Sequence, residues 1–142
     1  MRFWDSSALL PLFLPERFTQ RAEAWLESDP KVTIWALTRV EVLSAIARRR
    51  RAEPETVGLL QIARREAMRS WLNWTEVTDL ASVRRHAERI VETHPLRAAD
   101  ALQLGAALVA AEGDPSTLEF VTLDRRLADA AEREGFPVFG PD

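Results

Sequence analysis

The chain has 142 residues, close to the usual size of one domain, and we expect residues 1–142 to fold as a single domain. Hydrophobic residues make up 46% of the chain and charged residues 29%, with 5 glycines and 8 prolines, which excludes collagen-like, low-complexity and largely disordered proteins. With no cysteine and only 2 histidines, thiolate and histidine-rich metal sites are excluded, so any metal would be bound by oxygen. The formal net charge of −3 gives no indication of nucleic-acid binding.

The N-terminal segment carries an acid at Asp5 and lacks the apolar core of a signal peptide. No uncharged apolar run reaches the roughly 18 residues that a membrane-spanning helix needs. We therefore expect a cytoplasmic protein without a membrane span.

Short apolar segments alternate with longer amphipathic ones, which is the pattern of an α/β domain with a mostly parallel sheet. The segments predicted to form strands are Arg2 to Asp5, Val32 to Trp35, Trp74 to Val77, Glu119 to Leu123 and Pro137 to Phe139. The segments predicted to form helices are Ser7 to Leu14, Arg17 to Glu27, Arg39 to Arg51, Pro54 to Leu72, Leu80 to Thr93, Arg97 to Ala111 and Arg125 to Glu134.

Two carboxylates follow predicted strands directly. Asp5 ends the first strand and Asp124 follows the fourth, so each is expected at the carboxyl edge of the sheet, where open parallel sheets bind ligands. Each also has a structural alternative of equal weight, because Asp124 can cap the helix that begins at Arg125 and Asp5 can cap the first helix.

Asp100 lies on an apolar helical face. Helical spacing places Gln103, Leu104 and Ala107 on the same side. A carboxylate that points inward among such residues is costly unless it is paired or binds a cation. Pairing with Arg97 one turn earlier is the structural alternative.

Glu41 has two interpretations that we weigh equally. Thr38 and Glu41 match the capping-box pattern, in which the glutamate returns to the backbone of the capping threonine. Alternatively, Glu41 belongs to a site, because Ser44 and Arg48 lie beside it at helical spacing and form an open polar margin.

If these four acids converge, they repel one another. Like charges in one cleft raise each other's pKa unless a divalent cation neutralises them. Oxygen ligands without cysteine or histidine select Mg²⁺ or Mn²⁺ over zinc.

Four motifs in order resemble the PIN-domain ribonucleases, most closely the VapC-type toxins of toxin-antitoxin pairs. They are FWDSSAL at residues 3–9, LTRVEV at 37–42, LRAADALQL at 96–104 and FVTLDRRL at 120–127, so the resemblance spans nearly the whole chain. It implies a three-layer α/β/α PIN-like domain with a five-stranded parallel sheet. The residues that match the family's acidic quartet around Mg²⁺ or Mn²⁺ are Asp5, Glu41, Asp100 and Asp124, and Ser6 and Thr122 match its hydroxyl positions.

The resemblance also implies a function and partners. The chain would be a metal-dependent endoribonuclease, with RNA as its substrate, a cognate VapB-type antitoxin as its inhibitor, and a second copy of itself in a homodimer. Asp5, Asp100 and Asp124 are then assigned as metal ligands and Glu41 as a ligand or water-orienting base. The arginines near the predicted cleft are candidate phosphate contacts, with simple solvation as the alternative for each: Arg39, Arg48 and Arg97.

Other residues are expected to be structural. Packing is the first expectation for most of the five tryptophans, with base stacking as the alternative, whereas Trp25 could instead meet a partner. His86 and His94 are expected at the surface, without a catalytic role. The predicted partner surface is the helical pair from Arg17 to Glu27 and from Pro54 to Leu72, with ordinary core packing as its alternative. It carries Phe18, Trp25, Leu26, Leu59, Ile62, Met68 and Trp71.

Three other functions compete with this interpretation. A phosphorylated receiver domain needs a lysine after its last strand, and residues 136–142 contain none. A haloacid-dehalogenase-like phosphatase needs a second aspartate two positions after Asp5, where Ser7 stands. A PIN fold that binds RNA or a partner without cutting is the main alternative, and the presence of all four acids argues against it.

Overall fold

The computed structural model describes residues 1–142 and contains a five-stranded sheet in the order β3-β2-β1-β4-β5. All neighbouring strands are parallel. The strands are β1 Arg2–Trp4, β2 Val32–Trp35, β3 Thr75–Val77, β4 Glu119–Val121 and β5 Val138–Phe139. The predicted parallel five-stranded sheet is confirmed, each strand within two residues of its expected bounds.

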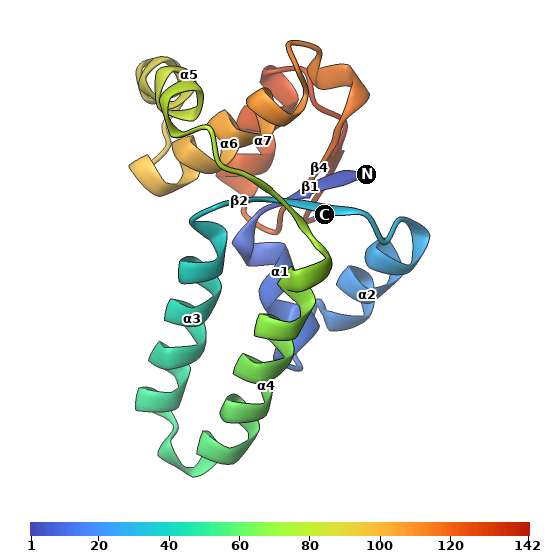
Figure 1. The fold of residues 1–142 in the computed structure, drawn as a ribbon, viewed down its shortest axis with the longest axis vertical. Helices are drawn as coiled ribbons and strands as arrows, with labels where there is room; N and C mark the ends of the chain where they lie inside the picture. The colour runs from blue at the N-terminus through green and yellow to red at the C-terminus, as the bar shows by residue number, and fades with distance from the viewer.

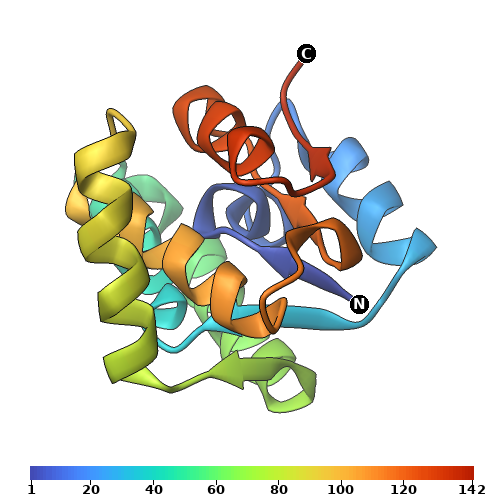
Figure 2. The ribbon, with the colours of Figure 1, turned by 90° about the horizontal axis from the view of Figure 1, so that it is seen from above.

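Seven α-helices cover the two faces of the sheet (Figure 1). They are α1 Ser6–Phe13, α2 Thr19–Ser28, α3 Thr38–Ala52, α4 Val57–Ser70, α5 Leu80–Thr93, α6 Ala98–Ala110 and α7 Arg125–Arg133. Helices α1 to α4 pack on one face, and α5 to α7 contribute to the core on the other, with α5 packed beside α6 (Figure 2). The predicted α/β/α sandwich is therefore confirmed.

Alternation along the strands builds the two cores. Phe3 and Phe120 point towards the α5 to α7 side, where their rings stack with centroids 5.5 Å apart. Their chain neighbours Trp4 and Val121 point to the opposite core. Because successive strand side chains point to opposite faces and both faces are covered by helices, these short strands are apolar throughout.

The strand order creates a switch point beside β1. From β1 the chain moves outward through β2 and β3 on one side, and later returns to β4 and β5 on the other. Crossover helices leave β1 and β4 towards opposite faces, which opens a crevice at the carboxyl ends of these two strands. Asp5 and Asp124 directly follow these strands, so the topology brings them to one place.

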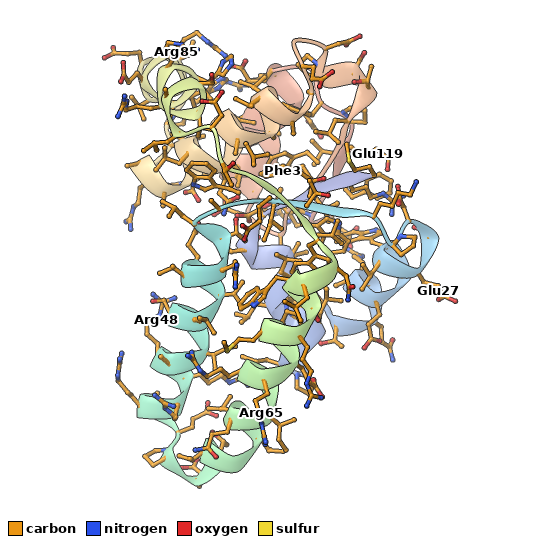
Figure 3. All side chains as sticks on the ribbon, in the orientation of Figure 1. Phe3, Glu27, Arg48, Arg65, Arg85 and Glu119 are labelled. Carbon is orange, nitrogen blue, oxygen red and sulfur yellow. The ribbon has the colours of Figure 1, made fainter.

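Most helix boundaries agree with the sequence prediction, but the segment from Pro54 to Leu72 does not form one helix. It begins with a 3-10 turn at Pro54–Thr56 and ends in a second at Trp71–Asn73. A hairpin of α3 and α4 projects from the body of the molecule, and Figure 3 shows Arg48 and Arg65 on it. No helix is long and apolar enough to cross a membrane.

Most of the tryptophans are buried, and so is one of the two histidines. Trp4, Trp35 and Trp71 are buried, as packing predicts. Trp25 packs edge-on to the ring of Phe139, with centroids 6.1 Å apart, and so belongs to the core margin. The expectation of a surface position for His94 is wrong, because it is only 9% exposed.

Candidate active site

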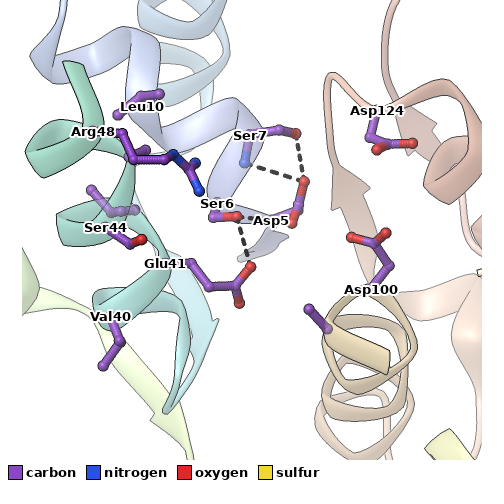
Figure 4. A pocket seen from close by; sticks show the side chains of 13 residues that line it. Asp5, Ser6, Ser7, Leu10, Val40, Glu41, Ser44, Arg48, Asp100 and Asp124 are labelled. Carbon is purple, nitrogen blue, oxygen red and sulfur yellow. Dashed lines mark hydrogen bonds between the residues drawn. The ribbon is translucent and has the colours of Figure 1, made fainter. Parts of the chain in front are cut away.

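All four predicted acids line one cleft of about 530 Å³ at the carboxyl ends of β1 and β4. Asp5 and Glu41 lie on one side of it, and Asp100 and Asp124 on the other (Figure 4). The four carboxylates come from four segments that are remote in the sequence, so the strand order, not local structure, brings them together.

Asp5 is held by hydroxyl groups on both sides. It caps α1 by accepting a 3.2 Å hydrogen bond from the backbone N–H of Ser7, and its Oδ2 also accepts from Thr122 Oγ1 at 2.9 Å. The side chain is 2% exposed, and this burial raises the pKa of the Asp5 carboxyl against the opposing effect of the hydrogen bonds. The capping and cleft-lining interpretations of Asp5 therefore both describe the molecule.

Glu41 does not form the capping box. Helix α3 has Leu37 at its N-cap without a side-chain cap bond, and Thr38 is a fully buried first residue of the helix. The carboxylate of Glu41 instead accepts hydrogen bonds from Gln103 Nε2 at 2.8 Å and from Ser6 Oγ at 3.2 Å. The capping interpretation is wrong because Gln103, remote in the sequence, takes the place of the local partner.

Burial is also the main cause of the raised pKa of Glu41, and the negative charges of Asp5 and Asp100 contribute to the same rise. Hydrogen bonds from Gln103 and Ser6 favour the charged form of Glu41 and therefore partly offset this rise in its pKa. The carboxylate is therefore fixed in position by two donors and kept in a negative environment.

Asp100 faces the cleft from the first turn of α6. Burial, followed by the charges of Asp5 and Asp124, raises the pKa of Asp100 to about 6. Arg97 lowers this pKa in part, but the two side chains form no ion pair within 4.0 Å. The alternative of a paired, structural Asp100 therefore does not describe the molecule.

Asp124 combines a cap with a place in the cleft. Its Oδ1 accepts from the backbone N–H of Leu127 at 3.0 Å and so caps α7, which confirms the capping prediction. Its own N–H donates to Thr122 Oγ1 at 3.1 Å. Thr122 thus joins Asp5 and Asp124 through one buried hydroxyl group, because it directly follows β4, the strand that pairs with β1.

The cleft concentrates negative charge without cationic partners. None of its four carboxylates takes part in an ion pair within 4.0 Å. As the side chains stand, no three acidic or histidine residues are close enough together to hold a metal ion. Because its acids are unpaired, the site can attract a cation by its negative charge. Because the acids are too far apart as they stand, their side chains must move to complete a coordination shell.

The sequence and the fold of this chain are matched in known proteins. The profile of the PIN domain family matches residues 2–133. The chain belongs to the PIN domain family. Among curated proteins, this PIN domain is 32% identical over 133 residues to Ribonuclease VapC45 and to Ribonuclease VapC49, from two strains of Mycobacterium tuberculosis. Each alignment covers 94% of this chain and 90% of the relative.

Solved structures show the same fold. The crystal structure of PAE2754 from Pyrobaculum aerophilum superposes with a TM-score of 0.66 at 23% identity, covering 98% of this chain and 87% of that one. A toxin-antitoxin complex from Klebsiella pneumoniae superposes with a TM-score of 0.61 at 20% identity, covering 98% and 96%. FitAcB from Neisseria gonorrhoeae superposes with a TM-score of 0.60 at 18% identity, with the same coverage. At these identities the likeness shows the PIN fold alone.

The PIN domain places the three candidate arginines differently. Arg48 lines the acidic cleft (Figure 4), and Arg97 lines an adjoining pocket. Arg39 instead pairs with Glu76 at 3.2 Å and lies over the ring of Trp71. Two positions along a helix correspond to about 200°, so Arg39 faces away from the cleft that Glu41 lines, and the structure does not bring it to the site.

Sequence reasoning missed two residues of this site. Ser7 Oγ donates to Asp5 and accepts the backbone N–H of Leu123 at 2.9 Å, so it ties α1 to the end of β4. Gln103 is fully buried and bonds Glu41. Its place on the inward face of α6 was a signal, because a buried amide needs partners that a purely apolar core cannot supply.

Proposed function

We propose that this PIN domain is a metal-dependent endoribonuclease that acts in the cytoplasm as the toxin of a toxin-antitoxin pair. The observation that carries the proposal is the convergence of four carboxylates without cationic partners on the switch-point cleft of the sheet. The relatives named Ribonuclease VapC support RNA as the substrate.

The donor set suits a hard divalent cation. The side-chain oxygens that line the cleft belong to carboxylates and hydroxyls, a set of possible ligands that prefers Mg²⁺ or Mn²⁺ to zinc. Asp5, Asp100 and Asp124 would hold the ion, with Glu41 as a further ligand or a base. A bound cation would supply Lewis-acid activation of the phosphodiester and neutralise the acidic cluster.

The chain's own groups would orient the reactants. Glu41 is held by Gln103 and Ser6 and is suited to accept the proton of an attacking water, since its raised pKa makes it a better base. Arg48, which carries no ion pair, can contact a phosphate at the edge of the cleft.

Metal removal tests this function. Purified protein should cleave single-stranded or looped RNA with Mg²⁺ or Mn²⁺, and EDTA should abolish cleavage until either ion is restored. Asp5→Asn, Glu41→Gln, Asp100→Asn and Asp124→Asn should each lose cleavage and retain the fold by circular dichroism. Equal cleavage in EDTA contradicts the metal mechanism, and tight RNA binding without cleavage by the wild type favours the non-cutting PIN protein.

We further propose a VapB-type antitoxin as the partner and a homodimer as the oligomeric state. The solved neighbour from Klebsiella pneumoniae, described as a toxin-antitoxin complex, supports a partner of this kind. Within the predicted partner surface, Leu59 is 70% exposed and Ile62 is 47% exposed, so both are available to a partner. Trp71 is buried and Trp25 packs on Phe139, so these two tryptophans are removed from that surface.

Two measurements test the partners. Light scattering should give the mass of a dimer. A small protein encoded beside this gene should inhibit cleavage, and Leu59→Ser should weaken the inhibition. A monomeric mass contradicts the dimer, and unchanged inhibition excludes Leu59 from the interface.

A further inference from the structure

A second pocket adjoins the acidic cleft. It has a volume of about 390 Å³, and Asp100 and Asp124 line both hollows. Arginines supply half of its lining: Arg97, Arg125 and Arg126. The acidic cleft is therefore bordered by Arg48 on one side and by this arginine pocket on the other.

Two of the three guanidinium groups have no partner in the protein. Arg97 and Arg126 are exposed and form neither an ion pair nor a side-chain hydrogen bond, whereas Arg125 binds the backbone carbonyl of Asp142. Elsewhere, the partly buried Arg2 pairs with Glu119 and Arg89 pairs with Glu134. Arginines that border the cleft without a partner are available to a ligand.

Two helices also begin at this pocket. Arg97 is the N-cap of α6 and makes no side-chain cap bond, and Asp124 is the N-cap of α7. Ala98 and Ala99, in the first turn of α6, are exposed. The N-terminus of α7 is already capped by the carboxylate of Asp124, whereas that of α6 has no side-chain cap, so the positive end of the α6 dipole adds to the arginine charges and favours an anion.

We propose that Arg97 and Arg126 form a phosphate subsite for the nucleotide next to the scissile bond, and that Arg48 contacts the strand on the opposite side. This inference rests on the proposed ribonuclease function. Flanking phosphates would be repelled by the four acids, so a strand that crosses the cleft needs cations at both borders to hold it in register. The RNA then runs from Arg48, across the acids, to the arginine pocket.

Salt-dependent RNA binding tests the subsite. Binding of a labelled single-stranded RNA is measured in a Glu41→Gln background, which prevents cleavage and leaves the arginine pocket intact. Arg97→Ala combined with Arg126→Ala should weaken binding about tenfold and reduce the slope of log affinity against log salt by about 0.7 for each lost phosphate contact.

The matched control is Arg64→Ala combined with Arg65→Ala, which removes the same charge from exposed positions of α4 that line neither pocket. Arg65 lies on the projecting hairpin (Figure 3). A control pair that changes the slope equally would show that only net charge matters and would overturn the subsite. Arg126→Lys should retain part of the binding, which separates loss of charge from loss of the fold.

A phosphate scan locates the contact. RNAs with one neutral methylphosphonate each are bound to the wild-type and Arg126→Ala forms of the Glu41→Gln background. At one position beside the scissile bond, the methylphosphonate should weaken RNA binding by the form that retains Arg126 and leave RNA binding by the Arg126→Ala form unchanged. The subsite is overturned if no methylphosphonate position behaves differently in the two forms. It is also overturned if Arg97→Ala combined with Arg126→Ala weakens binding to the antitoxin but not to RNA.

The same variants distinguish failure of the subsite from failure of the function. If wild-type protein cleaves RNA with metal and the arginine pair behaves like the control, the subsite is wrong and the nuclease stands. If wild-type protein cleaves no RNA but one methylphosphonate position still depends on Arg126, the nuclease is wrong, and Arg97 and Arg126 remain only a phosphate contact of a PIN protein that binds RNA without cutting it.

Discussion

The side-chain amide of Gln103 donates a 2.8 Å hydrogen bond to Glu41 Oε1, across 62 positions of the chain. The same amide lies 2.9 Å from Thr38 Oγ1, and Gln103 has no exposed surface. This contact joins the first turn of α3 to α6, and it sets the direction of the Glu41 carboxylate. Gln103 is thus a positioning residue for Glu41.

Gln103→Leu should lower kcat for RNA cleavage by about 10- to 100-fold and leave KM nearly unchanged, because Glu41 loses its donor and the phosphate contacts remain. The free energy of unfolding should fall by about 1–3 kcal/mol, since Thr38 and Glu41 lose a buried partner. Gln61→Leu, at an exposed position of α4, is the control and should change neither. An unchanged kcat would remove Gln103 from the site.

Ser6→Ala and Ser7→Ala should separate activity from stability. Ser6 donates to Glu41, so its loss should lower kcat with little change in melting temperature. Ser7 bonds Asp5 and the backbone of Leu123, so its loss should lower the free energy of unfolding by about 1–2 kcal/mol as well. Kinetics and thermal melts of the two variants, measured together, check the difference, and identical profiles would contradict it.

Asp100→Asn should raise the stability of the metal-free protein at neutral pH. The folded-state pKa of Asp100 is raised to about 6, so its contribution to stability is present at low pH and is lost as pH rises through about 6. After allowance for solvent screening, the gain should be about 1 kcal/mol at pH 7 and should vanish near pH 4. Melts in EDTA test this, with Asp129→Asn as an exposed control on α7.

Adding Mn²⁺ provides a second reading of the same variant. The ion should stabilise the wild type more than Asp100→Asn, because binding to the folded state raises its melting temperature. Equal stabilisation of both proteins would exclude Asp100 as a ligand.

Glu134→Gln should lower stability at pH 7 by about 2 kcal/mol. Arg89 donates two hydrogen bonds to Glu134 at 2.9 and 2.8 Å, and His94 Nε2 lies 2.7 Å from Oε1. The hydrogen bonds from Arg89 are the main reason that the pKa of Glu134 falls to about 2.

The direction of the pH effect follows from this lowered pKa. The contribution of Glu134 is present above its ordinary value of 4.5 and is lost as pH falls towards 2. Denaturant titrations at pH 7 and pH 3 should therefore show a smaller gap between wild type and variant in acid. Glu132→Gln, at an exposed position in the last turn of α7, should show no difference in stability from the wild type at either pH.

The partners of polar side chains could not be predicted from the sequence. The local pattern at Thr38 and Glu41 satisfied the capping box, yet Gln103 bonds both residues instead. Arg39 stands two residues from Glu41, but the helix turns it to Glu76. His94 directly follows α5, and its ring bonds to Glu134, the C-cap residue of α7. In each case a partner distant in the chain outweighs the local preference.

The sequence by itself determined the order of strands and helices and the position of Asp5 and Asp124 at strand ends, because hydrophobic periodicity and turn residues act over a few neighbouring positions. Only the tertiary structure decided that β1 and β4 are neighbours with the switch point between them, and that Glu41 faces the cleft. These features depend on which strands pair and on contacts such as Gln103 with Glu41, whose free energy comes from groups brought together by folding and not by proximity in the chain.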